Sequence, residues 1–236
     1  MVGLAIAVCL FNAYLLGSIP TGYVVAKTVK GIDIRQHGSG STGTTNVLRT
    51  VGKAAALAVL IIDLIKGAAA VRLTAVAYPA FVGQWANSPI NVETQLPWLM
   101  TVAGLLALIG HSKSVWINFK GGKSAASGLG VLLAIAWPIG LGVMAIFATV
   151  VLVSRIVSLG SMVAAISVML LMALTRQPLP YLLLAIAGGG YVLLRHRSNI
   201  ERILAGTEPH LGDAAKTALV QPVPPASNPD HHNAPS

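Results

Sequence analysis

Long runs of apolar residues, separated by short polar stretches, dominate the 236-residue sequence. The runs cover residues 2–26, 54–77, 98–109, 128–153, 158–174 and 179–194. Several of them reach the roughly 20 residues that a helix needs to cross the hydrocarbon core of a bilayer. They are continuous rather than alternating, and an open strand would leave its backbone groups unpaired in lipid. We therefore expect an all-α polytopic membrane protein.

Basic residues are unevenly distributed over the polar stretches. Five lie in residues 27–53, three in 113–123 and four in 195–216, whereas residues 78–97 contain none. Lys and Arg are enriched in cytoplasmic loops. The three basic stretches are therefore expected on the cytoplasmic face, with residues 78–97 and the N-terminus outside.

Six simple crossings do not satisfy this charge pattern, because the stretch after residue 195 would then face outward. Trp137-Pro138 interrupts the fourth run near its middle, and proline removes a helical N–H and clashes with the preceding turn. If the break were the only observation, a single span bent at the proline would explain it. The charge pattern instead favours a chain in which residues 128–136 enter the membrane from the cytoplasm and residues 138–153 return to that face. Arg155 then lies inside, and the chain has about seven transmembrane or half-membrane helices.

The composition agrees with a membrane protein and argues against nucleic-acid binding, a disulfide framework and a cysteine-based metal site. The chain is 55% hydrophobic and 10% charged, with a mean hydropathy of +0.75, whereas soluble domains carry about 25% charged residues. The net charge of +9 is explained by cytoplasmic loops facing anionic headgroups, so we expect no nucleic-acid partner. The single Cys9 lies in the first run, which excludes a disulfide framework or a cysteine-based metal site within one chain.

Domain organisation follows from the end of the last apolar run. We expect an integral membrane domain over residues 1–212 and a disordered tail over residues 213–236, which are rich in Pro, Ser, Asn and Ala. The first run lacks a basic n-region and is expected to be a retained span rather than a cleaved signal peptide. His231 and His232 in the tail are expected to be solvated, and we predict no metal and no cofactor.

The first polar stretch of chemical interest is residues 38–49, Gly-Ser-Gly-Ser-Thr-Gly-Thr-Thr-Asn-Val-Leu-Arg. Small residues let backbone N–H groups contact an oxyanion, and a helix starting near Thr44 would direct its positive end there. The stretch matches GxGxxG formally, but it follows a membrane helix instead of a strand, so nucleotide binding is not supported. A flexible connecting loop is the alternative. The predicted phosphate contacts are Gly38, Ser39, Gly40, Gly43, Thr45, Asn46 and the bidentate guanidinium of Arg49.

Residues 110–124 form a second glycine- and lysine-containing stretch. Gly121, Gly122 and Lys123 suit a phosphate, although the spacing fails the Walker A pattern because Ile117 stands at its first glycine. His111 lies where a helix ends, which suits a general base and a helix cap equally.

In the third stretch, His196, Asn199 and Arg202 are spaced three residues apart and share one helical face that suits a polar headgroup. Inside the second apolar run, Asp63 and Lys66 are also three residues apart. Ionisable residues inside a membrane span usually have a functional role, but an ion pair with a purely structural role explains these two equally well.

The three stretches closely resemble the signature motifs of the bacterial acyl-phosphate:glycerol-3-phosphate acyltransferase family (PlsY). The family patterns read about GSGNxGxTNxxR, GHxFPxxxxFxGGKxxAT and HxxNIxRxxxGxE; this chain has GSGSTGTTNVLR, GHSKSVWINFKGGKSAAS and HRSNIERILAGTE. The resemblance covers about residues 3–210. Ser41, Lys113-Ser114 and Ser127 depart from the family residues.

This resemblance implies transfer of an acyl group from acyl phosphate to the 1-hydroxyl of sn-glycerol 3-phosphate, at the cytoplasmic face of the bacterial inner membrane among its lipids. The products would be lysophosphatidic acid and inorganic phosphate. It implies that Ser39, Arg49, Lys123, Asn199 and Arg202 hold glycerol 3-phosphate. It assigns the acyl phosphate to the glycine-rich stretch with Thr45 and Asn46, and to His196 and Ser161. A transporter or flippase for a phosphorylated metabolite is the alternative, since broken helices also bind anions in transporters.

Overall fold

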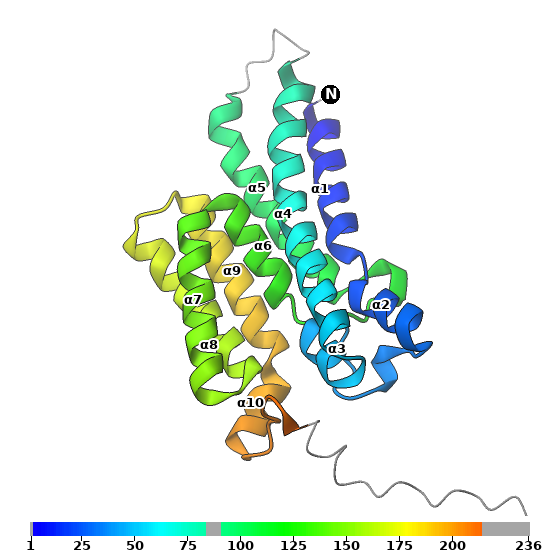
Figure 1. Ribbon diagram of the computed structural model, residues 1–236. Helices are drawn as coiled ribbons and strands as arrows, with labels where there is room; N and C mark the ends of the chain where they lie inside the picture. The colour runs from blue at the N-terminus through cyan, green and yellow to red at the C-terminus, as the bar shows by residue number, and fades with distance from the viewer. Residues whose placement is uncertain (1, 84–90, 214–236) are drawn as a thin grey trace, which may run out of the picture.

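The computed structural model describes residues 2–83 and 91–213, which are helical throughout apart from turns and loops (Figure 1). Of the predicted tail, residues 213–236, all but Asp213 lie outside the described residues. The elements follow in one list: α1 (Val2–Ser18), α2 (Thr21–Lys30), η1 (Ile34–Gln36), α3 (Thr44–Thr50), α4 (Lys53–Gly83), α5 (Val92–Ser112), η2 (Val115–Ile117), α6 (Ala125–Ile135), α7 (Trp137–Ser154), α8 (Val157–Leu174), α9 (Leu179–Arg195) and α10 (Arg197–Leu204).

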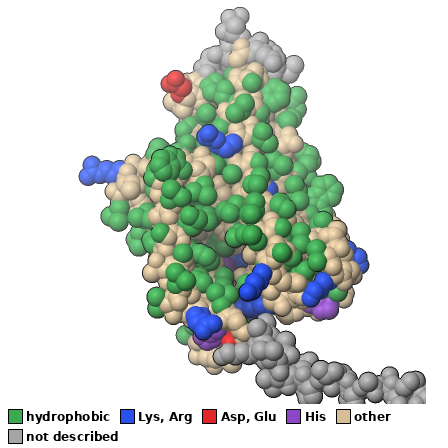
Figure 2. All heavy atoms as spheres, viewed as in Figure 1, with side chains coloured by type: hydrophobic (Ala, Val, Ile, Leu, Met, Phe, Trp, Pro, Cys, Tyr) green, Lys and Arg blue, Asp and Glu red, His purple; other side chains and the backbone are tan. Residues whose placement is uncertain are grey.

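The described helices have the lengths and composition of membrane spans. Five segments are long and apolar enough to cross a bilayer, and α9 with α10, bent by 56°, makes a sixth if counted as one span. Helix α4 has 31 residues, which at 1.5 Å per residue is about 46 Å and exceeds a hydrocarbon core of about 30 Å. Figure 2 shows hydrophobic side chains over most of the visible face, with Lys, Arg and His concentrated near one end. The predicted polytopic α-helical membrane protein is confirmed.

The expected break in the fourth apolar run is present. Helix α6 ends at Ile135, and α7 begins at Trp137 with Pro138 in its first turn, where a missing N–H costs no helical hydrogen bond. With 11 residues, α6 rises about 16 Å, roughly half of a hydrocarbon core. Helix α7 then returns toward the end where α10 lies (Figure 1). Arg155, which follows α7, donates to the Leu211 carbonyl oxygen at 2.9 Å and so lies beside the segment after α10. Which membrane face this end occupies stays a prediction.

The first apolar run is not one continuous helix. Helix α1 ends at Ser18 and α2 begins at Thr21, with Pro20 between them. Proline has no N–H for a helical hydrogen bond and restricts the residue before it, which explains the break. Its consequence is that α2 turns aside and lies at the polar end of the bundle (Figure 1).

Glycines bring the central helices into backbone contact. A Cβ on Gly67 of α4 would lie 2.2 Å from the Ser127 carbonyl oxygen of α6, and one on Gly130 would lie 2.0 Å from the Leu64 oxygen. Small residues allow this close packing in membranes, where helix association depends on van der Waals contact. The polar end of α6 is thereby fixed against the middle of α4, which positions the site described next.

Candidate active site

The three polar stretches converge at one end of the bundle around a polar cavity of about 80 Å³. Helices α3, α4, α5, α6, α8 and α10 contribute to it, so residues far apart in sequence line one cavity. The polar lining residues are Ser39, Ser41, Thr45, Asn46, Arg49, Asp63, His111, Lys123, Ser124, Ser158, Ser161, His196, Asn199, Arg202 and Glu208.

Among the described helices, α3, α6 and α8 begin at this cavity. Thr45 belongs to the first turn of α3, Ala125 and Ala126 to that of α6, and Val157 and Ser158 to that of α8. The first N–H groups of a helix have no partner within it, and the helix dipole is positive there. The predicted start of α3 at Thr44 is confirmed. The convergence of these ends favours an anionic ligand.

The glycine-rich stretch is folded around the side chain of Asn46. This amide is buried; its nitrogen donates to the carbonyl oxygens of His37 and Ser41 at 2.9 Å, and its oxygen accepts the Ser39 N–H at 3.0 Å. Gly38 has φ +58°, and a Cβ there would lie 2.2 Å from the Asn46 Oδ1. Asn46 therefore uses its side chain to hold Ser39 at the cavity.

Four glycines that the sequence assigned to substrate do not line the cavity within the described residues: Gly38, Gly40, Gly121 and Gly122. A Cβ on Gly121 would lie 2.2 Å from the His111 carbonyl oxygen, and one on Gly122 would lie 2.1 Å from the His111 Nε2. These glycines are thus required for close packing of the loops. Gly43 does line the cavity, together with the start of α3.

Lys123 carries the central cation of the site. Its ammonium donates a hydrogen bond to the Asn199 Oδ1. Burial, reinforced by the positive charge of Arg202, lowers the pKa of Lys123 to about 8. A cation held in a partly buried cavity loses hydration that a bound anion can replace. The lysine is therefore suited to bind a phosphate.

Glu208 connects α8 and α10 at the cavity. Its carboxylate accepts hydrogen bonds from Ser158 Oγ and Asn199 Nδ2 at 2.7 Å, and from Arg202 Nε at 2.6 Å. Burial raises the pKa of Glu208, but these three hydrogen bonds outweigh it and hold the pKa below its ordinary value. Nothing in the sequence indicated these partners, and Ser158 was not predicted as a site residue. The only signal for Glu208 was its place in the third motif.

Arg49 and His196 complete the predicted set around the cavity. Arg49 donates to the Pro209 carbonyl oxygen at 3.1 Å, so the segment after α10 lies beside this guanidinium. The His196 Nδ1 lies 2.7 Å from the Val192 carbonyl oxygen. A carbonyl oxygen only accepts, so Nδ1 is the protonated nitrogen.

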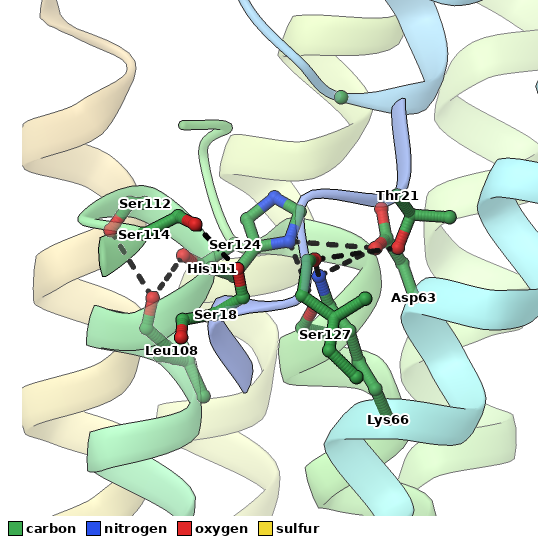
Figure 3. A network of polar contacts seen from close by, with 12 residues as sticks. Ser18, Thr21, Asp63, Lys66, Leu108, His111, Ser112, Ser114, Ser124 and Ser127 are labelled. Atoms are coloured by element: carbon green, nitrogen blue, oxygen red, sulfur yellow. Dashed lines mark hydrogen bonds and ion pairs between the residues drawn. The ribbon is translucent and has the colours of Figure 1, made fainter. Parts of the chain in front are cut away.

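Behind the cavity, Asp63 and Lys66 form the ion pair that the sequence analysis weighed against a functional role. The Lys66 Nζ lies 2.8 Å from the Asp63 Oδ1 and donates to the Ile19 carbonyl oxygen at 2.7 Å. Figure 3 shows that His111 points toward the same carboxylate, at 3.6 Å from Nδ1 to Oδ1. The third member of this network, His111, was not predicted.

An apolar cavity of about 260 Å³ adjoins the polar one and lies chiefly between α6, α7, α8 and α9. The two share lining residues at their junction, namely Thr45, Ala125, Ala126, Val157 and Ser161. A ligand that is anionic at one end and oily at the other fits this arrangement. The geometry thus combines neutralisation of negative charge with space for an acyl chain.

Comparison with known proteins points to one family. The model of the family described as glycerol-3-phosphate acyltransferase matches residues 7–206. Curated relatives named glycerol-3-phosphate acyltransferase include those of Trichormus variabilis, 53% identical over 89% of this chain and 93% of the relative, and Acaryochloris marina, 56% identical over 87% and 92%.

Solved structures give the same result. The chain is similar to the glycerol 3-phosphate form of PlsY, an integral membrane glycerol 3-phosphate acyltransferase, with a TM-score of 0.78 and 35% identity. That match covers 92% of this chain and 99% of the PlsY chain. The lysophosphatidic acid form of PlsY matches with a TM-score of 0.74 over 88% of this chain and 95% of that chain.

Proposed function

The chain belongs to the glycerol-3-phosphate acyltransferase family, and we propose that it transfers an acyl group from acyl phosphate to the 1-hydroxyl of sn-glycerol 3-phosphate. The products are lysophosphatidic acid and inorganic phosphate. The observation that carries this proposal is the polar cavity, lined by Arg49, Lys123 and Arg202, which adjoins an apolar cavity and shares lining residues with it. Two phosphate-bearing substrates need cations, and the acyl chain needs an apolar channel.

The roles are divided between the two sides of the cavity. Ser39, Arg49, Lys123, Asn199 and Arg202 bind glycerol 3-phosphate. The acyl phosphate is held by Gly43 and Thr45 at the start of α3, together with His196 and Ser161. Asn46 supports them by holding the glycine-rich loop in place. Thr45 and Ser161 line both cavities, which supports placing the reacting carbonyl beside them.

The reaction needs little covalent chemistry from the protein. The 1-hydroxyl oxygen attacks the acyl carbonyl carbon, the bond from this carbon to the phosphate oxygen breaks, and phosphate leaves with the electron pair. The hydroxyl proton passes to the phosphate of the glycerol 3-phosphate itself. Because phosphate is a good leaving group, positioning and charge neutralisation supply the catalysis. The cations and helix N-termini of the cavity are suited to both tasks.

The direct test is a two-substrate assay on the purified protein in nanodiscs. Phosphate release and lysophosphatidic acid, identified by mass spectrometry, should both require acyl phosphate and glycerol 3-phosphate. Equal turnover with acyl-coenzyme A or an acyl-carrier protein would refute the choice of donor. Uptake of glycerol 3-phosphate into proteoliposomes without acyl transfer would instead favour a transporter, although loops and helix N-termini line this cavity.

Orientation is tested separately. We place the polar end at the cytoplasmic face of the bacterial inner membrane, because the basic stretches gather there. In a Cys9→Ser background, Arg155→Cys should resist a membrane-impermeant maleimide in spheroplasts, while Glu93→Cys at the opposite end should react. The reverse labelling pattern would overturn this orientation.

A further inference from the structure

A buried ion pair behind the cavity is not used by the proposed reaction. Asp63 is fully buried and lines the cavity, and Lys66 is 4% exposed. Replacing both members of such a pair by well-packed neutral groups is often neutral or stabilising, because desolvation offsets the attraction. Stability alone is therefore a weak reason for its presence, and its neighbours indicate another role.

The imidazole of His111 connects this pair to the loop that carries Lys123. Its Nδ1 lies 3.6 Å from the Asp63 Oδ1 and 3.2 Å from the Ser127 Oγ (Figure 3). A carboxylate beside one ring nitrogen favours the proton on that nitrogen and fixes the ring orientation. Asp63 and Ser127 thus hold the His111 ring from two helices, α4 and α6.

The opposite edge of the same ring supports the turn before Lys123. A Cβ on Gly122 would lie 2.1 Å from the His111 Nε2, and the Gly122 N–H donates to the His111 carbonyl oxygen at 3.2 Å. On its other side, the Gly122 carbonyl oxygen accepts from Arg195 at 3.3 Å. A rotation of the imidazole therefore displaces the residue next to Lys123.

We propose that Asp63, paired with Lys66, is a positioning residue: through the His111 ring it fixes the turn that carries Lys123, and so sets where the Lys123 ammonium lies in the cavity. This rests on the proposed function, in which Lys123 binds the phosphate of the acceptor substrate. Lys66 contributes by joining the pair to the end of α1 through the Ile19 carbonyl oxygen.

The test replaces both charges, as Asp63→Asn with Lys66→Met, and measures kcat/KM for glycerol 3-phosphate as a function of pH. Misplacement of a binding group by about 1 Å can cost about 100-fold, so we expect kcat/KM to fall about 30- to 100-fold. Thermal unfolding should stay within about 5 °C of the wild type. Thr74→Val, a buried substitution on the same helix α4 away from the cavity, is the matched control and should keep wild-type kinetics.

The pH profile separates positioning from mere structural support. A Lys123 ammonium released from its place becomes better hydrated, so the alkaline limb of kcat/KM should move upward from near pH 8 in the double variant. The charges that act on this ammonium are those of Arg202 from α10, Glu208, Arg195 from α9 and Arg49 from α3. Asp63 from α4, His111 from α5 and His196 line the same cavity. Of these groups the double variant alters only Asp63, and Lys66→Met removes the charge paired with it.

Each outcome decides the matter. Unchanged kcat/KM overturns the proposal, and so does lower activity with an unmoved alkaline limb, whatever the thermal stability. If the double variant does not fold, Ser127→Ala removes only the hydrogen bond to the His111 Nδ1, and should lower kcat/KM several-fold with the same upward movement of the limb. Absence of turnover in the wild type would instead refute the proposed function, which keeps the two failures distinct.

Discussion

The protonation state of Lys123 should limit the reaction at alkaline pH. Burial and the nearby charge of Arg202 lower the pKa of this lysine to about 8 from an ordinary value of 10.5. The second ionisation of a phosphate monoester lies near pH 6, so the acceptor substrate is already dianionic at neutral pH. Above pH 8, loss of charge on the enzyme lysine is therefore the change that weakens substrate binding.

The magnitude follows from this pKa. With a pKa of about 8, about three quarters of Lys123 is charged at pH 7.5 and about one tenth at pH 9. Because kcat/KM reports the free enzyme, log kcat/KM for glycerol 3-phosphate should be level near pH 7 and fall with a slope of −1 above pH 8. With this pKa, a loss of about eightfold is expected between pH 8.5 and 9.5.

The assay follows lysophosphatidic acid formation between pH 6.5 and 9.5, because acyl phosphate also hydrolyses without enzyme. Lys123→Arg is the matched variant, since a guanidinium stays charged throughout this range. It should have a lower maximal rate but no alkaline limb. A limb that persists in Lys123→Arg, or a wild-type profile that is flat to pH 9.5, would refute the reasoning.

Other substitutions test the remaining parts of the site. Arg49→Lys should lower kcat/KM about 100-fold with normal thermal unfolding, because a single ammonium cannot replace a bidentate guanidinium. Near-wild-type turnover in this variant would show that Arg49 does not bind the substrate phosphate. Glu208→Ala should lower the free energy of unfolding by about 1–3 kcal/mol, because Ser158, Asn199 and Arg202 lose the carboxylate that accepts their hydrogen bonds. Chemical denaturation measures this change, and unchanged stability would contradict the prediction. Gly67→Val should cost at least about 2 kcal/mol, since its Cβ would lie 2.2 Å from the Ser127 backbone oxygen; wild-type stability and activity would show that α4 and α6 can separate.

Sequence periodicity and charge predicted the bundle well because membrane spans obey strong constraints. Each span must satisfy its own backbone in lipid, so the apolar runs correspond closely to helices. Pro138 predicted the break at Trp137, and the charge distribution predicted that the chain returns there, as α6 and α7 do. The break at Pro20 was missed, because an apolar run continues across it and only the proline signals it.

The roles of the glycines and Asn46 were harder to predict from the chain. A glycine that exposes N–H groups and one that admits a neighbouring ring are identical in sequence. Only the contacts of Gly122 with His111 show that close packing requires this glycine. Asn46 likewise has the chemistry of a ligand-binding amide, but its hydrogen bonds hold its own loop.

The sequence by itself determined that this is a helical membrane protein with three phosphate-suited stretches and the motifs of one family, because these properties depend on local residue types and spacing. The basic residues also predicted that the three stretches share one face. The tertiary structure alone decided that they line one cavity, that an apolar cavity adjoins it, and that Asp63 contacts His111. The physical reason is that such contacts join residues dozens of positions apart, and helix packing, which no local pattern encodes, sets their distances.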